Sequence, residues 1–332
     1  MLPYLTEIIW YENTGIPYAM RQFKDVDHDV CIISMRNRES ADVNRVCHMY
    51  DSSKGILLKK ESLDKKNEVF LCEFDFVYNM RASQDDLHIL EKLLTMAAMK
   101  DFMQCHEGIH TGNVREKLFI NHYEPGYKEL FYGGRAGDII RPYYGKTSGW
   151  YVNYNENIIN KKNGEYASLR DERIFMYPKI YITRTGNPFK AFYDNNTYAS
   201  NNFFSLQYLD YSINNRDNLM LILALINSRL CQYFIRMFAA PRLGNTFVET
   251  KIIHLLKFPI PRTIDEKNKE RIVTIVEGII DAKKENLDAC TEANKSEIDR
   301  LVYHLYGLTY DEVKIVDPET PITKEEYEAM GN

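Results

Sequence analysis

The stretch that most constrains the fold of this chain is residues 218–242, which hold its strongest hydrophobic anchor. Apolar side chains recur there at steps of three and four, a spacing typical of a helix with a wide apolar face. These side chains are Leu219, Ile222, Leu223, Ile226, Leu230, Tyr233, Phe234 and Met237. We therefore predict a helix over 218–238. The residues beyond it, Arg242 and Asn245 around Gly244, suit a loop that contacts a phosphate or a base edge. The alternative is a core helix with an ordinary solvated C-terminal turn.

Length and composition narrow the class of protein. With 332 residues and 45% hydrophobic content, the chain can form two domains with true cores. Its six cysteines lie far apart without a CxxC pair, which argues against zinc and disulfides and favours a reducing cytoplasm. The N-terminal residues lack a basic segment followed by an apolar run, and no apolar stretch reaches the length of a membrane span. We expect a cytoplasmic protein with no membrane partner and no metal site.

The net charge of -5 is unevenly distributed. Residues 101–262 hold 20 Lys and Arg against 14 Asp and Glu, an excess of 6 positive charges. Residues 1–100 hold 13 against 16, and residues 263–332 hold 9 against 17. The basic middle also contains 15 of the 24 tyrosines, and basic residues interleaved with aromatics suit a surface that follows phosphates and contacts bases. Alternatively, the tyrosines mark half-buried strands and the excess charge is chance.

The hydrophobic periodicities predict an α+β protein. Strands are expected at 30–35, 69–77 and 203–208, with a hairpin between 173–184 and 189–193. Helices are expected at 84–105 with Ser83 as N-cap, around 272–280, and around 298–306 up to Gly307. A further helix should begin at the capping box of Thr309 and Glu312.

Three polar motifs were considered as sites. The glycines of 133–137 form a GGxxG pattern, which is a weak phosphate cradle because no strand-then-helix unit surrounds it. The loop 107–113 has two glycines and predicts a tight turn. Asp25, Asp27 and Asp29 could hold a metal ion, although such a cluster more often forms a polar turn that enters a strand.

Seven segments in order resemble the TaqI-like C-terminal specificity domain of adenine-specific DNA methyltransferases and fused restriction-modification enzymes. They lie between about residues 105 and 316, and each is a weak signal alone. The segments are 107–113, 134–139, 178–184, 202–204, 223–229, 258–261 and 297–308. Residues 23–26 and 30–35 look like the closing strands of the methyltransferase domain that precedes such a module.

This resemblance implies four regions. Residues 1–82 would be a small α/β segment resembling the end of a methyltransferase domain, and 83–104 a connecting helix. Residues 105–262 would form a β-rich target-recognition domain that includes helix 218–238, and 263–332 a C-terminal helical bundle.

The resemblance further implies sequence-specific recognition of double-stranded DNA. The family's catalytic Asn/Asp-Pro-Pro-aromatic loop and its glycine-rich S-adenosylmethionine turn are missing from this sequence, and the nearest approach, 187–189, lacks the second proline. We therefore expect no catalysis and no cofactor here, with S-adenosylmethionine bound only by an associated methyltransferase domain. The expected partners are double-stranded DNA and a methyltransferase or restriction subunit.

Side-chain chemistry suggests which residues meet DNA. Arginine and lysine suit guanine and phosphate, asparagine suits adenine, and tyrosine supplies contact area. The candidates are Arg135, Arg141, Tyr143, Tyr144, Lys179, Arg184, Arg242 and Asn245. Two rival functions stay open: a metal-dependent nuclease built on the aspartates of 25–29, and an assembly module whose acidic helices 265–306 bind a methyltransferase subunit.

Overall fold

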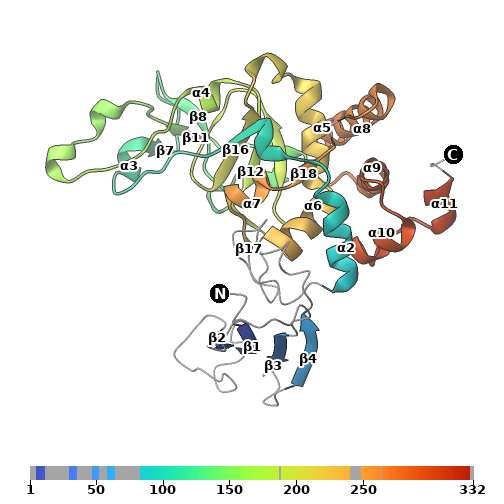
Figure 1. Cartoon of the computed structure of the whole chain (residues 1–332). Helices are drawn as coiled ribbons and strands as arrows, with labels where there is room; N and C mark the ends of the chain where they lie inside the picture. The colour runs from blue at the N-terminus through green and yellow to red at the C-terminus, as the bar shows by residue number, and fades with distance from the viewer. Residues whose placement is uncertain are drawn as a thin grey trace. The chain divides into compact units, whose positions relative to one another are not determined.

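The computed structural model of the protein describes residues 5–11, 30–35, 47–51, 58–63, 83–186, 188–239, 248–261 and 263–329 (Figure 1). The chain divides into two compact units. One comprises Met1–Leu87 and Arg236–Phe247, and the other comprises His88–Ile235 and Val248–Asn332. The described elements include both helices and sheets, so the predicted α+β class is confirmed.

The smaller unit contains one four-stranded sheet in the order β2-β1-β3-β4. Its strands are β1 (Leu5–Tyr11), β2 (Val30–Met35), β3 (Cys47–Asp51) and β4 (Leu58–Leu63). β1 pairs antiparallel with β2 and parallel with β3, and β3 pairs antiparallel with β4. The strand predicted at 30–35 is confirmed as β2. The strand predicted at 69–77 lies outside the described residues, as do the aspartates of 25–29.

The larger unit is built on an antiparallel sheet in the order β14-β12-β16-β6. Its strands are β6 (Met103–Glu107), β12 (Lys179–Thr183), β14 (Ala191–Asp194) and β16 (Phe203–Tyr208). All of β16 is buried, including the polar side chains of Ser205 and Gln207, and the strand predicted at 203–208 is confirmed. The hairpin of β12 and β14 is confirmed, but 173–176 form a short helix, α4 (Arg173–Met176), in place of the predicted strand. Pro178 holds the residue before it in an extended conformation, so the strand begins only after the proline.

A second sheet shares a core with the first. Its order is β15-β8-β11-β7, from Tyr198–Ala199, Lys128–Phe131, Trp150–Val152 and Phe119–Ile120. The ring of Phe131 lies 4.9 Å from that of Phe192 and 5.8 Å from that of Tyr181. Residues from both sheets belong to one buried hydrophobic cluster. The tyrosines of this region thus serve partly as core, as the alternative reading of the sequence anticipated.

The helix predicted over 84–105 is wrong beyond residue 93. Helix α2 spans Gln84–Leu93, and Ser83 caps it by accepting a hydrogen bond from Asp86 N at 3.2 Å. The chain then forms β5 (Ala97–Ala98), which pairs with β18 (Pro259–Ile260), and β6, which pairs with β16. Partners more than 90 residues away in sequence therefore override the local helical spacing.

The residues predicted as one helix, 218–238, form two helices. Helix α5 (Arg216–Asn227) and helix α6 (Arg229–Phe234) meet at Ser228, and their axes differ by 52°. Ser228 Oγ donates to Leu225 O and accepts from Cys231 N, so the same side chain ends one helix and caps the next. None of the described helices alone is long and apolar enough to cross a membrane; α5 and the following helix pass that test only as a bent pair.

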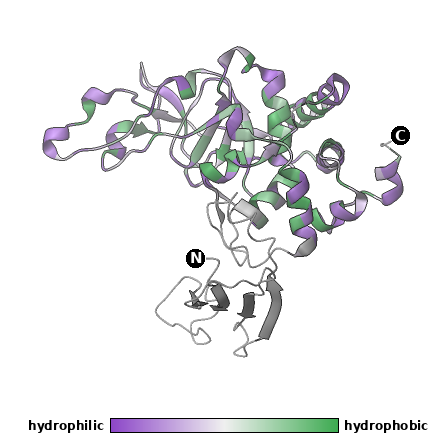
Figure 2. Cartoon of the chain, viewed as in Figure 1, coloured by the Kyte–Doolittle hydropathy of each residue, from purple (hydrophilic) through white to green (hydrophobic). Residues whose placement is uncertain are grey.

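Helix α5 connects the β-structure to the C-terminal helices. It contacts β12 and β14 of the first sheet and also α8 (Glu266–Glu285). Arg216 makes a two-bond ion pair with Glu277 of α8 and lies over the Tyr193 ring of β14. Figure 2 shows hydrophobic residues gathered on the central helices. Helix α5 is thus a support between the β-region and the C-terminal helices.

The C-terminal helices follow the predictions. α9 (Glu292–Leu305) and α10 (Tyr310–Val316) complete the predicted series after α8, and Thr309 and Glu312 form the predicted capping box. Gly307 has φ +64°, the left-handed conformation that ends a helix. An unpredicted helix, α11 (Lys324–Glu328), begins with a second capping box of Thr323 and Glu326.

Candidate nucleic-acid interface

Arginines from three separate loops belong to one connected surface of the larger unit. Arg135 is exposed in the turn η4 (Gly134–Ala136), Arg184 follows strand β12, and Arg170 precedes helix α4. We call Arg135, Arg170 and Arg184 the arginine row. Arginine suits both phosphates and guanine edges because its donors are fixed in one plane.

Hydrogen bonds connect the segments that carry the row. Asn202 donates from Nδ2 to Tyr132 O at 2.7 Å, beside the Arg135 turn, and its backbone carbonyl accepts from Arg184 N at 2.9 Å. Glu107 accepts from Arg170 Nη2 at 2.8 Å and lies 3.5 Å from Arg184 Nη1. One carboxylate between two guanidiniums orients both and leaves a positive balance. Arg170 and Arg184 are thus held in place before any ligand binds, while Arg135 is exposed.

Arg170 is held in an unusual backbone conformation. Its φ is +71°, and Arg170 and Tyr143 are the non-glycine residues with positive φ among those described. The guanidinium donates from Nε to Gly108 O at 3.2 Å as well as to Glu107. Strained residues of this kind persist where the surrounding contacts fix them, and they concentrate at ligand sites. Arg170 is therefore the member of the row most tightly positioned by its neighbours.

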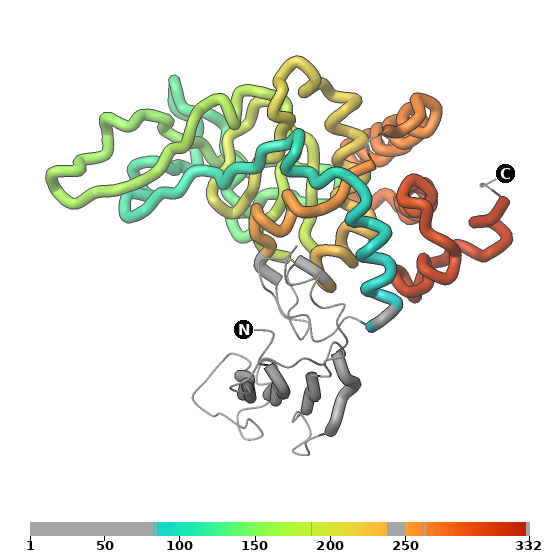
Figure 3. Tube along the Cα trace, viewed as in Figure 1, coloured from blue at the N-terminus to red at the C-terminus, as the bar shows by residue number. Residues whose placement is uncertain are grey.

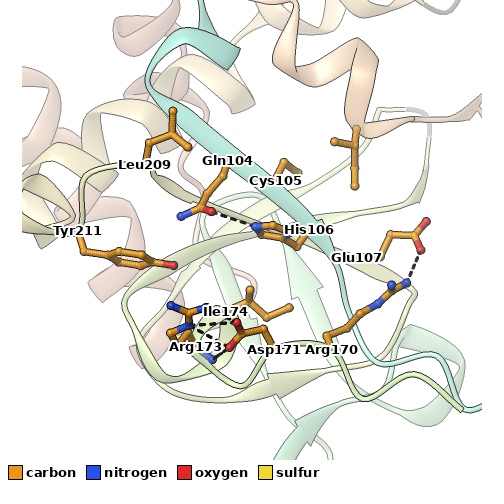
Figure 4. Close-up of a pocket in the computed structure, with 11 residues that line it drawn as sticks. Gln104, Cys105, His106, Glu107, Arg170, Asp171, Arg173, Ile174, Leu209 and Tyr211 are labelled. Carbon is orange, nitrogen blue, oxygen red and sulfur yellow. Dashed lines mark hydrogen bonds and ion pairs between the residues drawn. The ribbon is translucent and has the colours of Figure 1, made fainter.

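A pocket of about 570 Å³ opens beside Arg170 (Figure 4). Gln104 and His106 line it from alternate positions of β6, which place both side chains on one face of the strand. Arg173 and Asp171 form an ion pair of 2.6 Å on the opposite side, and Tyr211 closes one end. The hydrogen bond to Arg173 lowers the pKa of Asp171 to about 2, so this pair stays charged at neutral pH.

Hydrogen bonding in the pocket assigns the tautomer of His106. Gln104 Nε2 donates to Tyr208 O at 3.2 Å, so Gln104 Oε1 is the amide atom that faces His106 Nε2 at 3.1 Å. An amide oxygen only accepts, and Nε2 must therefore carry the proton. Burial and then the charge of Arg170 lower the pKa of His106, which is consequently neutral at pH 7. Its Nδ1 is then an acceptor, so the pocket offers both donors and an acceptor, as the readout of a base edge requires.

The GGxxG turn is organised around a carboxylate. Buried Asp138 accepts from Gly133 N at 2.6 Å and from Ser148 N at 2.9 Å. Gly133 and Gly137 have φ of +133° and +98°, conformations that glycine adopts readily. An internal carboxylate already occupies the donors that a phosphate would use. The expectation that this turn is not a nucleotide site is consistent with this arrangement.

Two of the sequence-based candidates are corrected by the structure. Lys179 is fully buried, where its Nζ lies 2.8 Å from Asp194 Oδ2 and donates to Phe175 O at 2.6 Å. Tyr143 is 3% exposed, and its backbone pairs with Ala191 O at 2.7 Å. Both side chains are buried and do not lie on the exposed surface that the prediction required.

The other candidates fall into three groups. Arg135 and Arg184 belong to the row described above. Arg141 and Tyr144 pair directly across the hairpin of β9 (Ile139–Arg141) and β10 (Tyr144–Lys146), which packs against β14. Arg242 and Asn245 lie outside the described residues.

A second pocket, of about 220 Å³, lies between the β9–β10 turn, α6 and α9. Asp299 accepts there from Arg229 N at 2.8 Å. Desolvation and then the nearby Asp317 carboxylate raise the pKa of Asp299 to about 7. The folded state therefore holds a proton on Asp299 between about pH 4 and pH 7 that the unfolded state releases. Its stabilising contribution is fully present below pH 4 and is lost as the pH rises through 7.

Replacing Asp299 by Asn should remove this pH dependence. The amide keeps the acceptor for Arg229 N and cannot ionise, so Asp299→Asn should be more stable than the wild type at pH 8 by up to about 4 kcal/mol, since raising a pKa by one unit corresponds to about 1.4 kcal/mol. At pH 4 and below the two proteins should be nearly equally stable, because Asp299 is then largely protonated in the unfolded state as well. Urea unfolding at pH 4, 5, 6, 7 and 8 measures the difference, with Asp281→Asn on the exposed face of α8 as control. A difference that does not grow between pH 5 and pH 8 contradicts the assignment.

Sequence reasoning missed Gln104, His106, Arg170 and Arg173. Gln104 lies at the end of the predicted helix 84–105 and His106 follows that helix directly, which concealed their alternation on β6. Arg173 is the first residue of the predicted strand 173–184. Arg170 lies in a polar segment without a motif, and its positive φ has no sequence signature. The polar alternation in Met103–Glu107 was the one signal available for the pocket.

Comparisons to known proteins bear on the fold and on the central part of the chain. Residues 134–260 match the family model of the TaqI-like C-terminal specificity domain, and they include all three members of the arginine row. The central part of this chain is thus similar to a TaqI-like C-terminal specificity domain. A search of curated protein sequences finds no match.

Two solved structures are similar to the chain. The type IIL restriction-modification enzyme MmeI, solved in complex with DNA, has a TM-score of 0.54 at 11% identity, covering 99% of this chain and 46% of that one. The type IIG restriction endonuclease BpuSI has a TM-score of 0.42 at 12% identity, covering 92% of this chain and 44% of that one. The likeness to MmeI is one of fold, and this chain spans less than half the length of either enzyme.

Proposed function

We propose that this chain is the target-recognition part of a restriction-modification enzyme and binds double-stranded DNA sequence-specifically through the arginine row and the adjoining pocket. The observation that carries the proposal is the continuity of the surface. The three arginines come from separate segments that Asn202 and Glu107 connect, and Arg170 lines a pocket with mixed donors and an acceptor. The chain itself performs recognition, and catalysis belongs to other parts of such an enzyme.

Two parts of this surface have different roles, one in contacting phosphates and one in contacting base edges. Exposed Arg135 can reach a phosphate, which sets the position of the protein on the duplex. The pocket beside Arg170 combines the guanidinium donors with the His106 Nδ1 acceptor, which suits the pattern on a base edge in the major groove. Affinity then comes mainly from the phosphates, and discrimination comes from the pocket.

Binding to a pool of randomised duplexes tests the proposal. The full chain should retain duplexes at low salt, enrich one sequence, and lose affinity steeply with salt, because each neutralised phosphate contributes roughly 0.9 to the slope of log K against log salt. Arg135→Ala should lower that slope by about 1 and weaken all sequences equally. Arg170→Gly, which removes the guanidinium at a φ that glycine accepts, should weaken the preference for the enriched sequence.

The control is Lys267→Ala, which removes one exposed positive charge from α8. Its binding curve should match the wild type within error. A folded chain that retains no duplex at low salt would refute DNA recognition. Co-purification with a methyltransferase subunit in that case would favour the assembly-module alternative.

A further inference from the structure

A polar arm projects from the second sheet of the larger unit. It consists of residues 153–169, between β11 and α4, and Figures 1 and 3 show it extending away from the sheets. Figure 2 shows hydrophilic residues along most of its length. Its tip is the turn η6 (Lys161–Asn163), and residues 160–164 are all exposed.

The arm is held firmly at its base. His110 and Ser168 exchange backbone hydrogen bonds of 2.9 and 2.8 Å. Asn113 fastens the returning strand twice, because its Nδ2 donates to Gly164 O at 3.1 Å and its Oδ1 accepts from Tyr166 N at 2.9 Å. The tight loop 107–113 therefore holds the base of the arm, and we call this loop the clasp. Since Gly112 has φ +51° and lies against Tyr166, this clasp requires a glycine.

The tip is also ordered by its own contacts. Glu165 accepts from Asn160 N at 2.8 Å and pairs with Lys117 Nζ at 2.5 Å. Asn160 N and O bond back to residue 165, so the arm folds into two adjacent chain segments. Exposed loops that a rigid scaffold holds in one conformation commonly carry binding residues.

Three of the five asparagines in the arm make side-chain hydrogen bonds, and among the described residues Asn163 at the tip does not. Asn153 donates to Tyr127 OH, Asn155 accepts from Asn157 N, and Asn160 accepts from Asn163 N. The side-chain amide of Asn163 makes no hydrogen bond to any residue that the structure describes, and neither Lys161 nor Lys162 forms an ion pair within that part of the chain. The tip therefore presents two ammonium groups and one amide to solvent.

We infer that the arm enters the major groove of a DNA duplex, with Lys161 and Lys162 on phosphates and Asn163 on an adenine edge. The inference rests on the proposed function and adds a second reading element to it. A pair of adjacent chain segments has the width that the major groove admits and the minor groove does not. An asparagine amide matches the acceptor and donor of adenine N7 and N6, and flanking lysines supply the phosphate contacts that fix register.

The test uses the full chain and the duplex that it enriches from a randomised pool. Lys161→Ala with Lys162→Ala should lower the slope of log K against log salt by about 2. The matched control, Lys267→Ala with Lys324→Ala, removes the same charge from exposed helical positions and should leave the slope unchanged. Asn163→Ala should relax the preference at one A·T pair by roughly 5- to 150-fold.

Base analogues identify the groove. Substituting 7-deazaadenine at that pair removes the major-groove acceptor and should weaken the wild type but leave Asn163→Ala unaffected. Substituting 3-deazaadenine, which alters the minor groove, should affect neither protein. If the wild type enriches a sequence while the arm variants keep its slope and its preferences, the arm inference is refuted and the proposed function stands. If the wild type retains no duplex, both are refuted.

Discussion

Asp194→Ala is expected to lower the free energy of unfolding by about 3–5 kcal/mol, because it leaves the buried Lys179 ammonium without its counter-charge. Lys179 is fully buried, and its Nζ lies 2.8 Å from Asp194 Oδ2. Two carbonyls, Phe175 O and Tyr177 O, accept its other protons at 2.6 and 3.2 Å. Asp194 also accepts from Thr197 N at 2.8 Å, so its removal strands a second donor. Unfolding in urea at pH 7 measures the loss.

The pH dependence identifies the cause of that loss. Burial lowers the pKa of Lys179, and Asp194 opposes this effect by attraction. Without the aspartate the folded pKa falls further below the unfolded value. The folded state then releases its proton at a lower pH, and stability is regained as the pH rises toward 10. Asp194→Ala should accordingly recover part of its deficit at pH 9–10 relative to the wild type.

A second substitution separates the charge from the packing. Lys179→Met in the Asp194→Ala background removes the stranded ammonium and should restore part of the lost stability. A double variant that is no more stable than Asp194→Ala alone would show that the loss comes from Thr197 and local packing.

The same ion pair shows where sequence reasoning stops. Lys179 was predicted to contact DNA because lysine suits guanine and phosphate and is usually exposed. Its partner is directly opposite in the register of β12 and β14, where Lys179 pairs with Asp194. Register depends on the length and shape of the 184–190 connection, which residue types alone do not determine. Elements with strong local signals were predicted well: strand β16, the helices from α8 to α10, and the Ser83 and Thr309 caps.

Ile226→Ala is expected to destabilise the larger unit by about 2–5 kcal/mol, the range for truncating a buried aliphatic side chain. Ile226 is fully buried on α5, which contacts both the first sheet and α8, so a cavity there weakens both. Denaturant titration of the full chain measures the change.

A chemically identical control exists on α7 (Ile252–Leu256). Ile253 is 49% exposed, so Ile253→Ala should change stability by less than about 0.5 kcal/mol. Equal losses of stability from the two variants would mean that α5 does not hold the first sheet and the C-terminal helices together.

The bend at Ser228 could not be predicted from the sequence pattern. The apolar spacing continues through it, while the Ser228 hydroxyl donates to Leu225 O and accepts from Cys231 N.

The sequence predicted which residue types form the candidate site better than it predicted which positions form it. Arg135 and Arg184 were predicted from side-chain chemistry to contact DNA, and both lie on the proposed surface. Arg170 could not be recognised, since its placement depends on a positive φ and on Glu107 from a strand that was taken for a helix. Contacts between distant segments decide such a site, and a single sequence does not record them.

The clasp at the base of the arm has an evolutionary consequence. The hydrogen bonds between 110–113 and 164–168 close the base of the arm, and Ile159 anchors the outgoing segment in the buried hydrophobic cluster. The exposed residues 161–163 can then be exchanged between relatives while these contacts and the two sheets keep their form. Substitutions at the tip can therefore change what the arm recognises without lowering the stability of the fold.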